Sequence, residues 1–265
     1  MRAALVAEWR KVVTTRMWWI LGLATFGYLL FLGAVLGFAF THPGTGSGGQ
    51  VPAHGRAAAE TLYTLAASLG YAFPLVIGAL SVTGEFRHRT ITPTLLVEPR
   101  RGRVLGSKLL VQLAVGAGFG VAGTVGAVLG GAPMLAIAGR ATWLSDSRVQ
   151  VDLVCCVLAL ALWAMVGVGV GSLLTNQVAA VVVILAFTQF VEPILRLGLA
   201  AFDPLAGASK FLPGAAAEAL AGASFYSTSG MAELLGRWQG GLVLLGYALL
   251  LAVLGRVTTL RRDVT

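Results

Sequence analysis

Charged residues are scarce in this sequence. Of its 265 residues only 11% are Asp, Glu, Lys or Arg, whereas soluble domains carry about 25%. Hydrophobic residues make up 57% of the chain, and the mean hydropathy is +0.84. This composition excludes an ordinary soluble domain and predicts a membrane protein.

Cysteine is also rare, and the two that occur are adjacent. Cys155 and Cys156 lie inside an apolar run. Neighbouring residues of one helix point in different directions, so we expect two free, inert thiols and no disulfide framework.

The catalytic and nucleotide-binding motifs that a sequence can display are missing. There is no G-x-x-x-x-G-K-[ST] phosphate loop, no H-E-x-x-H zinc motif and no G-x-S-x-G elbow. The glycines of "GVGVGS" at 167–172 lie inside an apolar run, where no dinucleotide site forms. The three histidines, His42, His54 and His88, fall in connectors. We therefore expect no enzyme activity, and no catalytic, cofactor or metal site in this chain.

Long apolar runs are what the sequence does contain. A bilayer span needs about 20 mostly apolar residues, and six runs meet this length, at 17–40, 61–83, 109–134, 153–175, 178–199 and 239–257. The connectors are too short for a separate soluble domain. The prediction is an all-α membrane protein with six transmembrane helices in one domain, residues 1–265, whose first run is a retained span and not a cleaved signal.

The net charge of +8 invites a nucleic-acid function, but the distribution of the charges argues for topology instead. Connectors 1–16, 84–108 and 256–265 hold 13 basic and 4 acidic residues, whereas 41–60, 139–152 and 192–238 hold 6 basic and 7 acidic. Loops rich in Lys and Arg stay in the cytoplasm. We expect both termini to be cytoplasmic, in a multi-pass protein of the plasma membrane that contacts lipids and no nucleic acid.

The segment 2–15 precedes the first span and predicts a basic amphipathic helix. Its apolar residues follow one helical stripe: Leu5, Val6, Trp9, Val12 and Val13. Such a helix lies in the membrane interface, and Trp18 and Trp19 mark the headgroup level beside it. Anchoring alone would also explain this pattern.

Small residues recur every four positions in the third run, at Gly118, Ala122, Gly126 and Gly130, and again at Gly116 and Gly120. This spacing favours close packing of helices in lipid.

Pro74 and Pro193 interrupt two other runs and can kink them. In the last outer connector, "FLPGAAAEALAG" predicts a short helix that starts at Pro213, ends near Gly222 and packs back against the spans.

Glu192 is the acid that the hydropathy pattern places near membrane depth, and Arg196 follows on the same helical face. Intramembrane charge marks a functional candidate. An i,i+4 ion pair, half solvated at the outer interface, is the alternative.

The connector 84–108, "GEFRHRTITPTLLVEPRRGRVLGSK", holds six of the 19 basic residues. Glu85 and Arg89 can pair at i,i+4. Thr92 can cap a short helix that begins at Pro93, and Pro99 would stop it. Twenty-five residues exceed what a simple hairpin between spans needs. The segment predicts either a docking element or a basic loop that only sets topology.

This connector resembles the first cytoplasmic connector of ABC-2 type transporter permeases, the six-span subunits of ATP-driven exporters. That connector runs approximately G-E-[YF]-x-x-G-T-I-x-x-T-L-L-x-x-P-x-R and then Lys. The matching residues here are Gly84, Glu85, Phe86, Thr90, Ile91, Thr94, Leu95, Leu96, Pro99, Arg101 and Lys108. "EWRKVVTTRMWW" is similar to the E-x-x-K lead-in of that family, and "KFLPGAAAEAL" to its last outer loop. Arg89 stands where the family usually has Gly, which predicts an unstrained helix at that position.

The resemblance implies a permease that pairs with a second permease chain, as a homodimer, and docks a separate ABC ATPase subunit. ATP and Mg would bind to that partner and not to this chain. Segment 84–108 would be the coupling helix, with 2–15 beside it. The implied coupling residues are Glu85, Arg87, His88, Arg89 and Thr90, which make polar contacts, and Leu95 and Leu96, which enter a groove of the ATPase.

By the same resemblance the second and fifth spans would line the transport pathway. The candidates for cargo contact are Tyr71, Phe73, Phe187, Gln189, Phe190 and Glu192. A drug, an antibiotic, a lipid or another amphipathic molecule would suit such a pathway. An ATP-independent channel or secondary carrier is the alternative, although such proteins usually show pore charges or inverted repeats.

Overall fold

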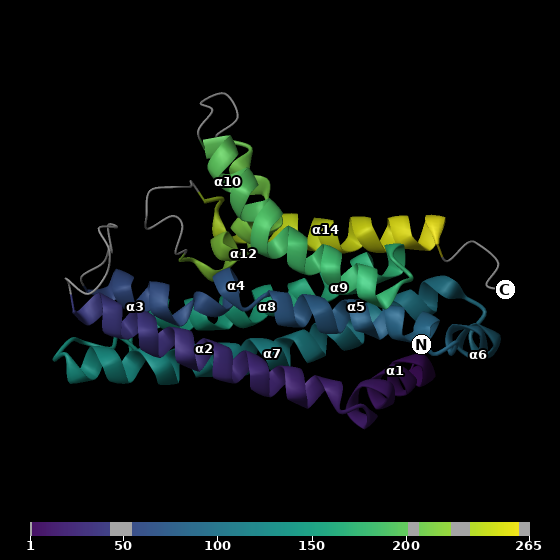
Figure 1. Cartoon of the computed structure of the whole chain (residues 1–265), viewed down its shortest axis with the longest axis horizontal. Coiled ribbons are helices and arrows are strands. Elements are labelled where there is room, and N and C mark those ends of the chain that lie inside the picture. The colour runs from purple at the N-terminus through teal and green to yellow at the C-terminus, as the bar shows by residue number, and fades with distance from the viewer. Residues whose placement is uncertain (1, 43–54, 201–206, 224–233, 260–265) are drawn as a thin grey trace.

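The structure is a computed structural model that describes residues 2–42, 55–200, 207–223 and 234–259. Within these ranges it contains helices and no strands (Figure 1). The helices are α1 (Arg2–Thr14), α2 (Met17–Thr41), α3 (Arg56–Tyr63), α4 (Leu65–Leu69), α5 (Ala72–Arg87), α6 (Ile91–Val97), α7 (Arg101–Ile137), α8 (Ser147–Leu173), α9 (Gln177–Ala186), α10 (Glu192–Ala200), α12 (Pro213–Ala221) and α14 (Arg237–Thr258). A π-helical turn, Phe187–Val191, joins α9 to α10, and a 3₁₀ turn, Ser209–Phe211, precedes α12.

Among the residues that the structure describes, five helical segments are long and apolar enough to cross a membrane: α2, α7, α8, α14 and the segment Gln177–Arg196. The all-α class and the transmembrane character of the prediction are therefore confirmed. The second predicted span, 61–83, is instead divided among α3, α4 and α5, with breaks at Thr64 and at Gly70–Tyr71. Pro74 falls in the first turn of α5, where its missing N–H would have had no helical partner in any case.

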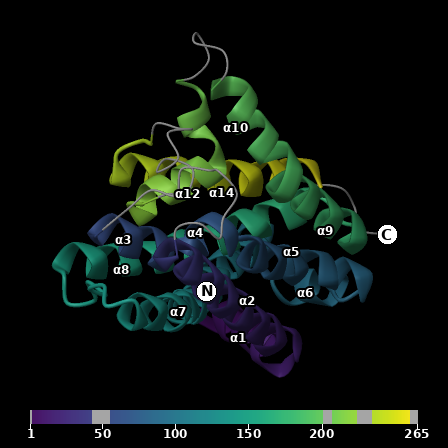
Figure 2. The ribbon, with the colours of Figure 1, turned by 60° about the vertical axis from the view of Figure 1, so that its left-hand side comes forward.

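The helices run roughly alongside one another, except that α10 projects from the bundle (Figures 1 and 2). One end of the bundle, here called the N-terminal end, carries α1, α6 and the last turn of α14 (Figure 1). There Thr259 donates to the Leu173 carbonyl over 3.3 Å, and Lys11 donates to Thr94 Oγ1 over 3.3 Å. The described parts of connectors 1–16, 84–108 and 256–265 thus lie at the same end of the bundle. That this end is cytoplasmic stays a prediction.

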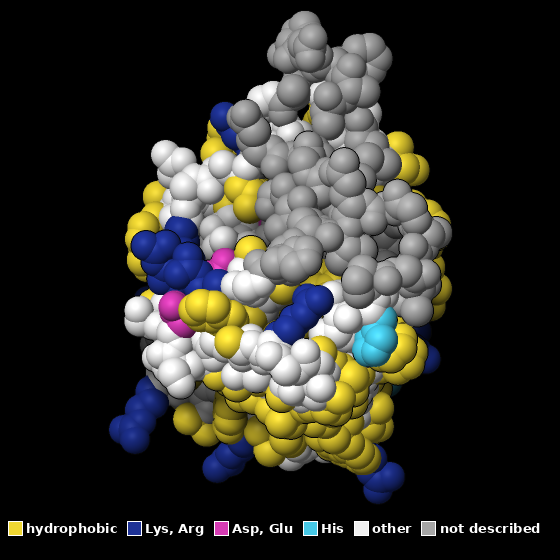
Figure 3. Space-filling model, turned by 90° about the vertical axis from the view of Figure 1, so that its left-hand side faces the viewer, with side chains coloured by type: hydrophobic (Ala, Val, Ile, Leu, Met, Phe, Trp, Pro, Cys, Tyr) yellow, Lys and Arg dark blue, Asp and Glu magenta, His cyan; other side chains and the backbone are white. Residues whose placement is uncertain are grey.

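The opposite end holds the described parts of connectors 41–60 and 139–152. Tyr63 donates to the Thr142 carbonyl over 2.8 Å, and Arg140 donates to the Phe40 carbonyl over 3.0 Å. On the described part of this face, basic and acidic side chains lie next to each other at one edge, and apolar side chains cover the lower flank (Figure 3). Most of the predicted outer loop 41–60 lies outside the described residues.

Glycines let α7 approach both of its main neighbours. A methyl group added to Gly126 would lie 2.6 Å from the Phe26 carbonyl oxygen of α2, and one added to Gly120 would lie 2.7 Å from Val157 Cα of α8. The packing role predicted for these glycines is confirmed. Gly118 is the exception, because nothing lies within 4 Å of the position its methyl group would take.

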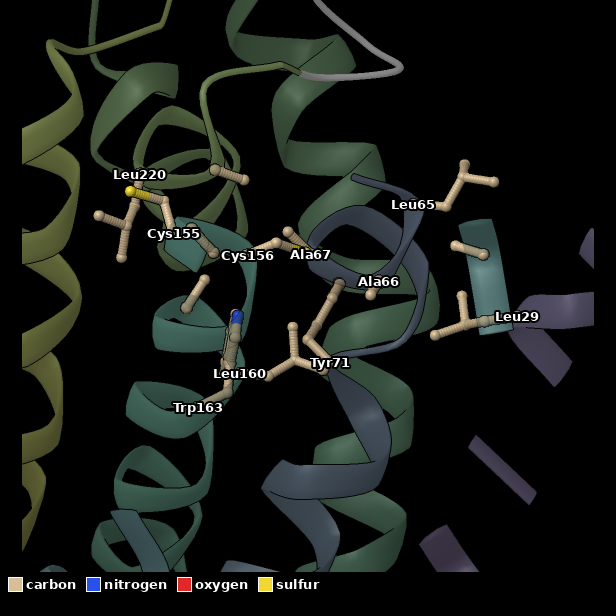
Figure 4. Close-up of a cluster of buried hydrophobic side chains, with 14 of the residues drawn as sticks. Leu29, Leu65, Ala66, Ala67, Tyr71, Cys155, Cys156, Leu160, Trp163 and Leu220 are labelled. Carbon is tan, nitrogen blue, oxygen red and sulfur yellow. The ribbon is translucent and has the colours of Figure 1, made fainter. Parts of the chain in front are cut away.

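The core lies where α4, α5, α7 and α8 meet (Figure 4). Trp163 is 1% exposed and stacks on Tyr71, with ring centroids 4.6 Å apart. Cys155 and Cys156 are buried and free, as predicted. Helix α12 is buried along its whole length and ends at Gly222, which has a φ of +92°. The predicted return of this segment against the spans is confirmed.

Candidate functional site

The turn between α5 and α6 has a left-handed residue at its centre. Arg89 has a φ of +55°. The Thr90 N–H donates to the Glu85 carbonyl over 2.9 Å, and the Arg89 N–H donates to the Phe86 carbonyl over 3.2 Å. This pair of bonds is a Schellman motif, in which glycine is the usual residue at the left-handed position. The prediction of an unstrained helix at Arg89 is therefore wrong, and the motif explains physically why glycine would be favoured there.

Helix α6 is short and rests on one buried residue. It begins at Ile91, so the cap position is Thr90 and not Thr92, and Thr90 makes no side-chain capping bond. Pro93 is the third residue of the helix and not its first, as a cap at Thr92 would have made it. The helix ends at Val97, before Pro99, as predicted. Ile91 is 3% exposed and fixes the start of α6 to the bundle.

The last turn of α6 presents apolar side chains to the outside. Leu96 is 77% exposed and Val97 is 88% exposed, whereas Leu95 is half-buried. Such a pair on a short helix between basic connectors has no packing role within the described chain. We call Leu96 and Val97 the α6 tip. The sequence pointed to Leu95 and Leu96, and it missed Val97.

Four charged side chains meet beneath α6. Lys108 Nζ lies 2.7 Å from Glu8 Oε2 and 2.7 Å from Glu85 Oε1, and Lys11 Nζ lies 2.6 Å from an oxygen of each carboxylate. Glu8, Glu85 and Lys108 are 6%, 6% and 3% exposed. We call these residues the four-charge cluster. Its two positive and two negative charges balance, so the buried ions are mutually compensated.

The four-charge cluster connects four helices. Glu8 and Lys11 come from α1, Glu85 from α5 and Lys108 from α7, and Lys11 also donates to Thr94 of α6. Burial lowers the pKa of Lys11, but hydrogen bonds and charge from the two glutamates outweigh this and leave the pKa raised. Lys11 therefore stays charged at neutral pH. Any movement of α6 or α1 relative to the bundle has to disturb these bonds.

Two expectations for Glu85 need correction. It pairs with Lys11 and Lys108, and the described structure contains no ion pair with Arg89, because Arg89 lies beyond the end of α5. Glu85 is also buried, so within this chain it supports α6 from below. The other predicted polar residues, Arg87, His88, Arg89 and Thr90, are exposed. Of these, Arg87 donates to Gln177 at the start of α9 over 3.3 Å.

A cavity of about 390 Å³ opens beside the four-charge cluster. Its walls are mixed, with apolar Ile77 and Leu80 beside polar Glu85, Gln112 and His88. Gln112 is 1% exposed, and its Oε1 has no hydrogen-bond partner among the described residues. The cavity can accept an amphipathic group that carries a hydrogen-bond donor.

The predicted pathway residues do not form one surface. Tyr71 is 5% exposed and donates to the Thr188 carbonyl over 3.1 Å, inside the π-helical turn that contains Phe187, Gln189 and Phe190. Phe73 packs against Tyr28 with ring centroids 5.7 Å apart. Gln189 is exposed, and Phe190 is 66% exposed on the outer surface of this segment. The structure thus joins the second and fifth predicted spans through Tyr71 and leaves Phe190 on an unpacked face.

Glu192 belongs to a second buried ion group, the Arg196 cluster. Arg196 lies 2.9 Å from Glu192 Oε1 and 3.0 Å from Glu218 Oε1, and the Gly214 N–H donates to Glu192 over 2.6 Å. Glu192 and Glu218 are each 1% exposed. The predicted pairing of Glu192 with Arg196 is confirmed, but the pair is buried and not half solvated.

Sequence reasoning missed most of the partners in both clusters. Glu8, Lys11 and Lys108 stood out only as matching positions in the resemblance, and Glu218 only as part of an outer helix. Glu8 and Lys11 pair at i,i+3. The bonds of Lys108 to Glu8 and Glu85, and of Arg196 to Glu218, span from 22 to 100 residues, which helical periodicity cannot reveal. Among the described residues no group of His, Cys, Asp and Glu could hold a metal ion.

No protein-family model matches this chain, and no curated protein matches it. The features that bear on function are the geometry of the two clusters and of the α6 tip, together with the resemblance of residues 84–108.

Proposed function

We propose that this chain is the permease subunit of an ATP-driven exporter of the ABC-2 type, in which α3–α5 complete a set of six spans. The observation that carries the proposal is the α6 tip. Two large apolar side chains, Leu96 and Val97, project outward at the end where the basic connectors gather. A soluble partner with an apolar groove and acidic rim would bury this pair and meet the surrounding positive charge.

In this proposal α6 is the coupling helix and the four-charge cluster transmits its movement. ATP-driven closure of the partner would displace the α6 tip. Because Thr94 and Glu85 are bonded to Lys11 and Lys108, the displacement would pass to α1 and α7 together. Rigid-body motion of packed helices is a common form of such switching.

A second permease chain would complete the pathway. The segment Gln177–Arg196 is only 22% buried, so much of its apolar surface is available to a partner chain or to lipid. The π-helical turn supports a role for this segment, because such turns occur frequently at functional sites. The proposed cargo is amphipathic, in keeping with the mixed walls of the 390 Å³ cavity.

The test is a double charge substitution at the α6 tip, Leu96→Asp with Val97→Asp. A charge buried in a partner's groove without a counter-charge is strongly unfavourable. This variant should therefore insert into the membrane normally, but it should no longer bind the ATPase subunit or transport cargo. Ile137→Asp is the matched control, since Ile137 is 80% exposed and lies at the opposite end of α7. It should keep the ATPase bound.

Two results would count against the proposal in different ways. If the wild-type chain, purified from its native membrane, brings no ATP-hydrolysing subunit with it, the assignment to an ABC exporter is wrong. If the wild-type chain binds an ATPase and the Leu96→Asp, Val97→Asp variant binds it equally well, the coupling role of α6 is wrong and residues 84–108 only set topology.

An ion-driven secondary carrier is the second candidate, because Glu192 and Glu218 are buried carboxylates and Glu192 lies in the apolar segment Gln177–Arg196. Such groups mark ion pathways in carriers. The two functions differ in their energy source. If transport stops when the ATPase partner is inactivated and continues when a proton uncoupler is added, the protein is an exporter. If transport continues without ATPase activity and stops with the uncoupler, it is a carrier.

A further inference from the structure

A wide apolar groove lies between α1, α2 and α7. Its volume is about 560 Å³, and none of the described residues that line it is polar or charged. Its lining includes three exposed tryptophans, an exposed glycine, and a half-buried glycine and phenylalanine: Trp9, Trp18, Trp19, Gly118, Gly22 and Phe26. Neither the four-charge cluster nor the α6 tip contributes a residue to it.

The groove is shallow and open at two glycines, of which Gly118 is exposed and Gly22 half-buried. A methyl group added to Gly22 or to Gly118 would meet nothing within 4 Å. Gly126, two turns further along α7, is by contrast filled by the backbone of α2. The small-residue stripe of α7 therefore changes from helix packing at Gly126 to an unfilled apolar space at Gly118. A space of this kind takes hydrocarbon in preference to water.

The charge around the groove has one sign. Within residues 2–23 the exposed charged side chains are Arg2, Arg10 and Arg16, and Lys11 is partly exposed. The single acid of this stretch, Glu8, is buried in the four-charge cluster, where Lys108 and Lys11 neutralise it. Arg10 lies three positions before Val13, and Arg16 three positions before Trp19, so each arginine is one helical turn from a residue that lines the groove. An anionic headgroup matches this surface.

We propose that this groove binds one anionic phospholipid, with an acyl chain over Gly22 and Gly118 and the phosphate facing Arg10 and Arg16. The proposal does not depend on the ATPase partner. Bound lipid would hold α1 at a second place, in addition to the four-charge cluster. Helix α1 supplies Trp9 to the groove and Glu8 and Lys11 to the four-charge cluster, so bound lipid and the cluster hold α1 from two sides.

The three tryptophans provide the signal for the test. The full chain, purified in detergent, is titrated with phosphatidylglycerol brominated in its acyl chains, and tryptophan fluorescence is followed. Quenching should saturate at one lipid per chain. Brominated phosphatidylcholine should bind about tenfold more weakly, since it lacks the net charge that Arg10 and Arg16 attract.

Filling the groove should abolish this signal. Gly118→Leu, and separately Gly22→Leu, should weaken the saturable quenching about tenfold or more, which corresponds to the loss of contact with two methylene groups. Gly27→Leu is the matched control, because Gly27 is exposed on α2, has nothing within 4 Å and does not line the groove. It should bind as the wild type does.

Three outcomes would overturn the proposal. The first is quenching that rises without saturation in the wild-type chain. The second is equal saturable quenching in the Gly118→Leu, Gly22→Leu and Gly27→Leu variants. The third is that the wild-type chain forms a dimer whose tryptophans resist quenching, and that Gly118→Leu converts this dimer to monomers. The occupant of the groove would then be a second copy of this chain. Equal affinity for the two lipids would overturn the assignment of an anionic headgroup.

Discussion

Lys108 and Glu8 lie 100 positions apart in the sequence, yet the Lys108 ammonium lies 2.7 Å from a Glu8 carboxylate oxygen. Lys108 is 3% exposed and donates also to Glu85 and to the Ser81 carbonyl. The bond fixes α1 to the start of α7. Because α6 is tied to the same group through Lys11, the N-terminal end of the bundle behaves as one unit.

Lys108→Met should therefore destabilise the protein by about 3–5 kcal/mol, since it leaves two buried carboxylates with one half-exposed lysine. Lys11→Met should cost less, because the Lys11 side chain is 41% exposed and water can replace part of its bonding. Thermal unfolding in detergent measures both. Adding Glu8→Gln to Lys108→Met should recover part of the loss. A Lys108→Met variant as stable as the wild type would show that the four-charge cluster is not a structural link.

Five of the six spans predicted from hydropathy coincide with helical segments long and apolar enough to cross a membrane, and hydropathy failed where a helix breaks or extends. The third run was expected at 109–134, but α7 covers Arg101–Ile137, because a helix continues through charged residues that hydropathy excludes. The second run was expected as one span. A window average cannot detect the breaks at Thr64 and Gly70, which local backbone conformation sets.

The candidate site was predicted in outline and not in its contacts. Pro99 indicated the end of α6, because proline restricts the residue before it. Glu85 was assigned to Arg89 by helical spacing, but the end of α5 falls between them and the long-range lysines take the carboxylate. A single sequence carries no signal for which of 19 basic residues folds back onto a given acid.

Arg89→Gly should stabilise the protein. A non-glycine residue in the left-handed region costs about 1–2 kcal/mol. Glycine relieves this strain, but it loses more conformational entropy on folding, which offsets part of the gain. We expect a net gain in stability of about 1 kcal/mol. The C-terminus of α7 offers a matched control. Gly139 has a φ of +69°, and the bonds from Gly139 and Arg140 to Ala136 and Leu135 form the same motif.

Gly139→Ala should accordingly lower stability by about 1 kcal/mol. Melting temperatures of the two variants, compared with the wild type, should move in opposite directions. A loss of stability in Arg89→Gly would mean that the Arg89 side chain makes a stabilising contact that outweighs its backbone strain.

Two glycines of the same α7 stripe should respond oppositely to alanine. Gly118→Ala meets open space and replaces a poor helix former, so it should stabilise by up to about 1 kcal/mol. Gly126→Ala would place a methyl group 2.6 Å from the Phe26 carbonyl oxygen, so α2 and α7 must separate. Overpacking of this kind typically costs about 1–3 kcal/mol. Equal effects at both positions would contradict the packing of α2 on α7.

The Arg196 cluster allows structure and transport to be separated. Arg196→Met removes the cation that Glu192 and Glu218 share, and breaking a buried ion group in this way costs about 3–5 kcal/mol. Arg56→Met is the matched control, because the Arg56–Glu60 pair is also an i,i+4 contact at 2.9 Å but is partly exposed, and such pairs contribute about 0–1 kcal/mol.

Glu192→Gln removes a charge from the Arg196 cluster with the least structural change. The amide oxygen of glutamine can still accept from the Gly214 N–H, and Arg196 keeps both of its 3.0 Å bonds to Glu218. We therefore expect a melting temperature close to that of the wild type, and a much smaller loss of stability than in Arg196→Met. Transport measured on this variant then reports on the charge alone. Reduced transport with unchanged folding would assign Glu192 a part in moving cargo, whereas unchanged transport would show that the Arg196 cluster only holds α12 against α10.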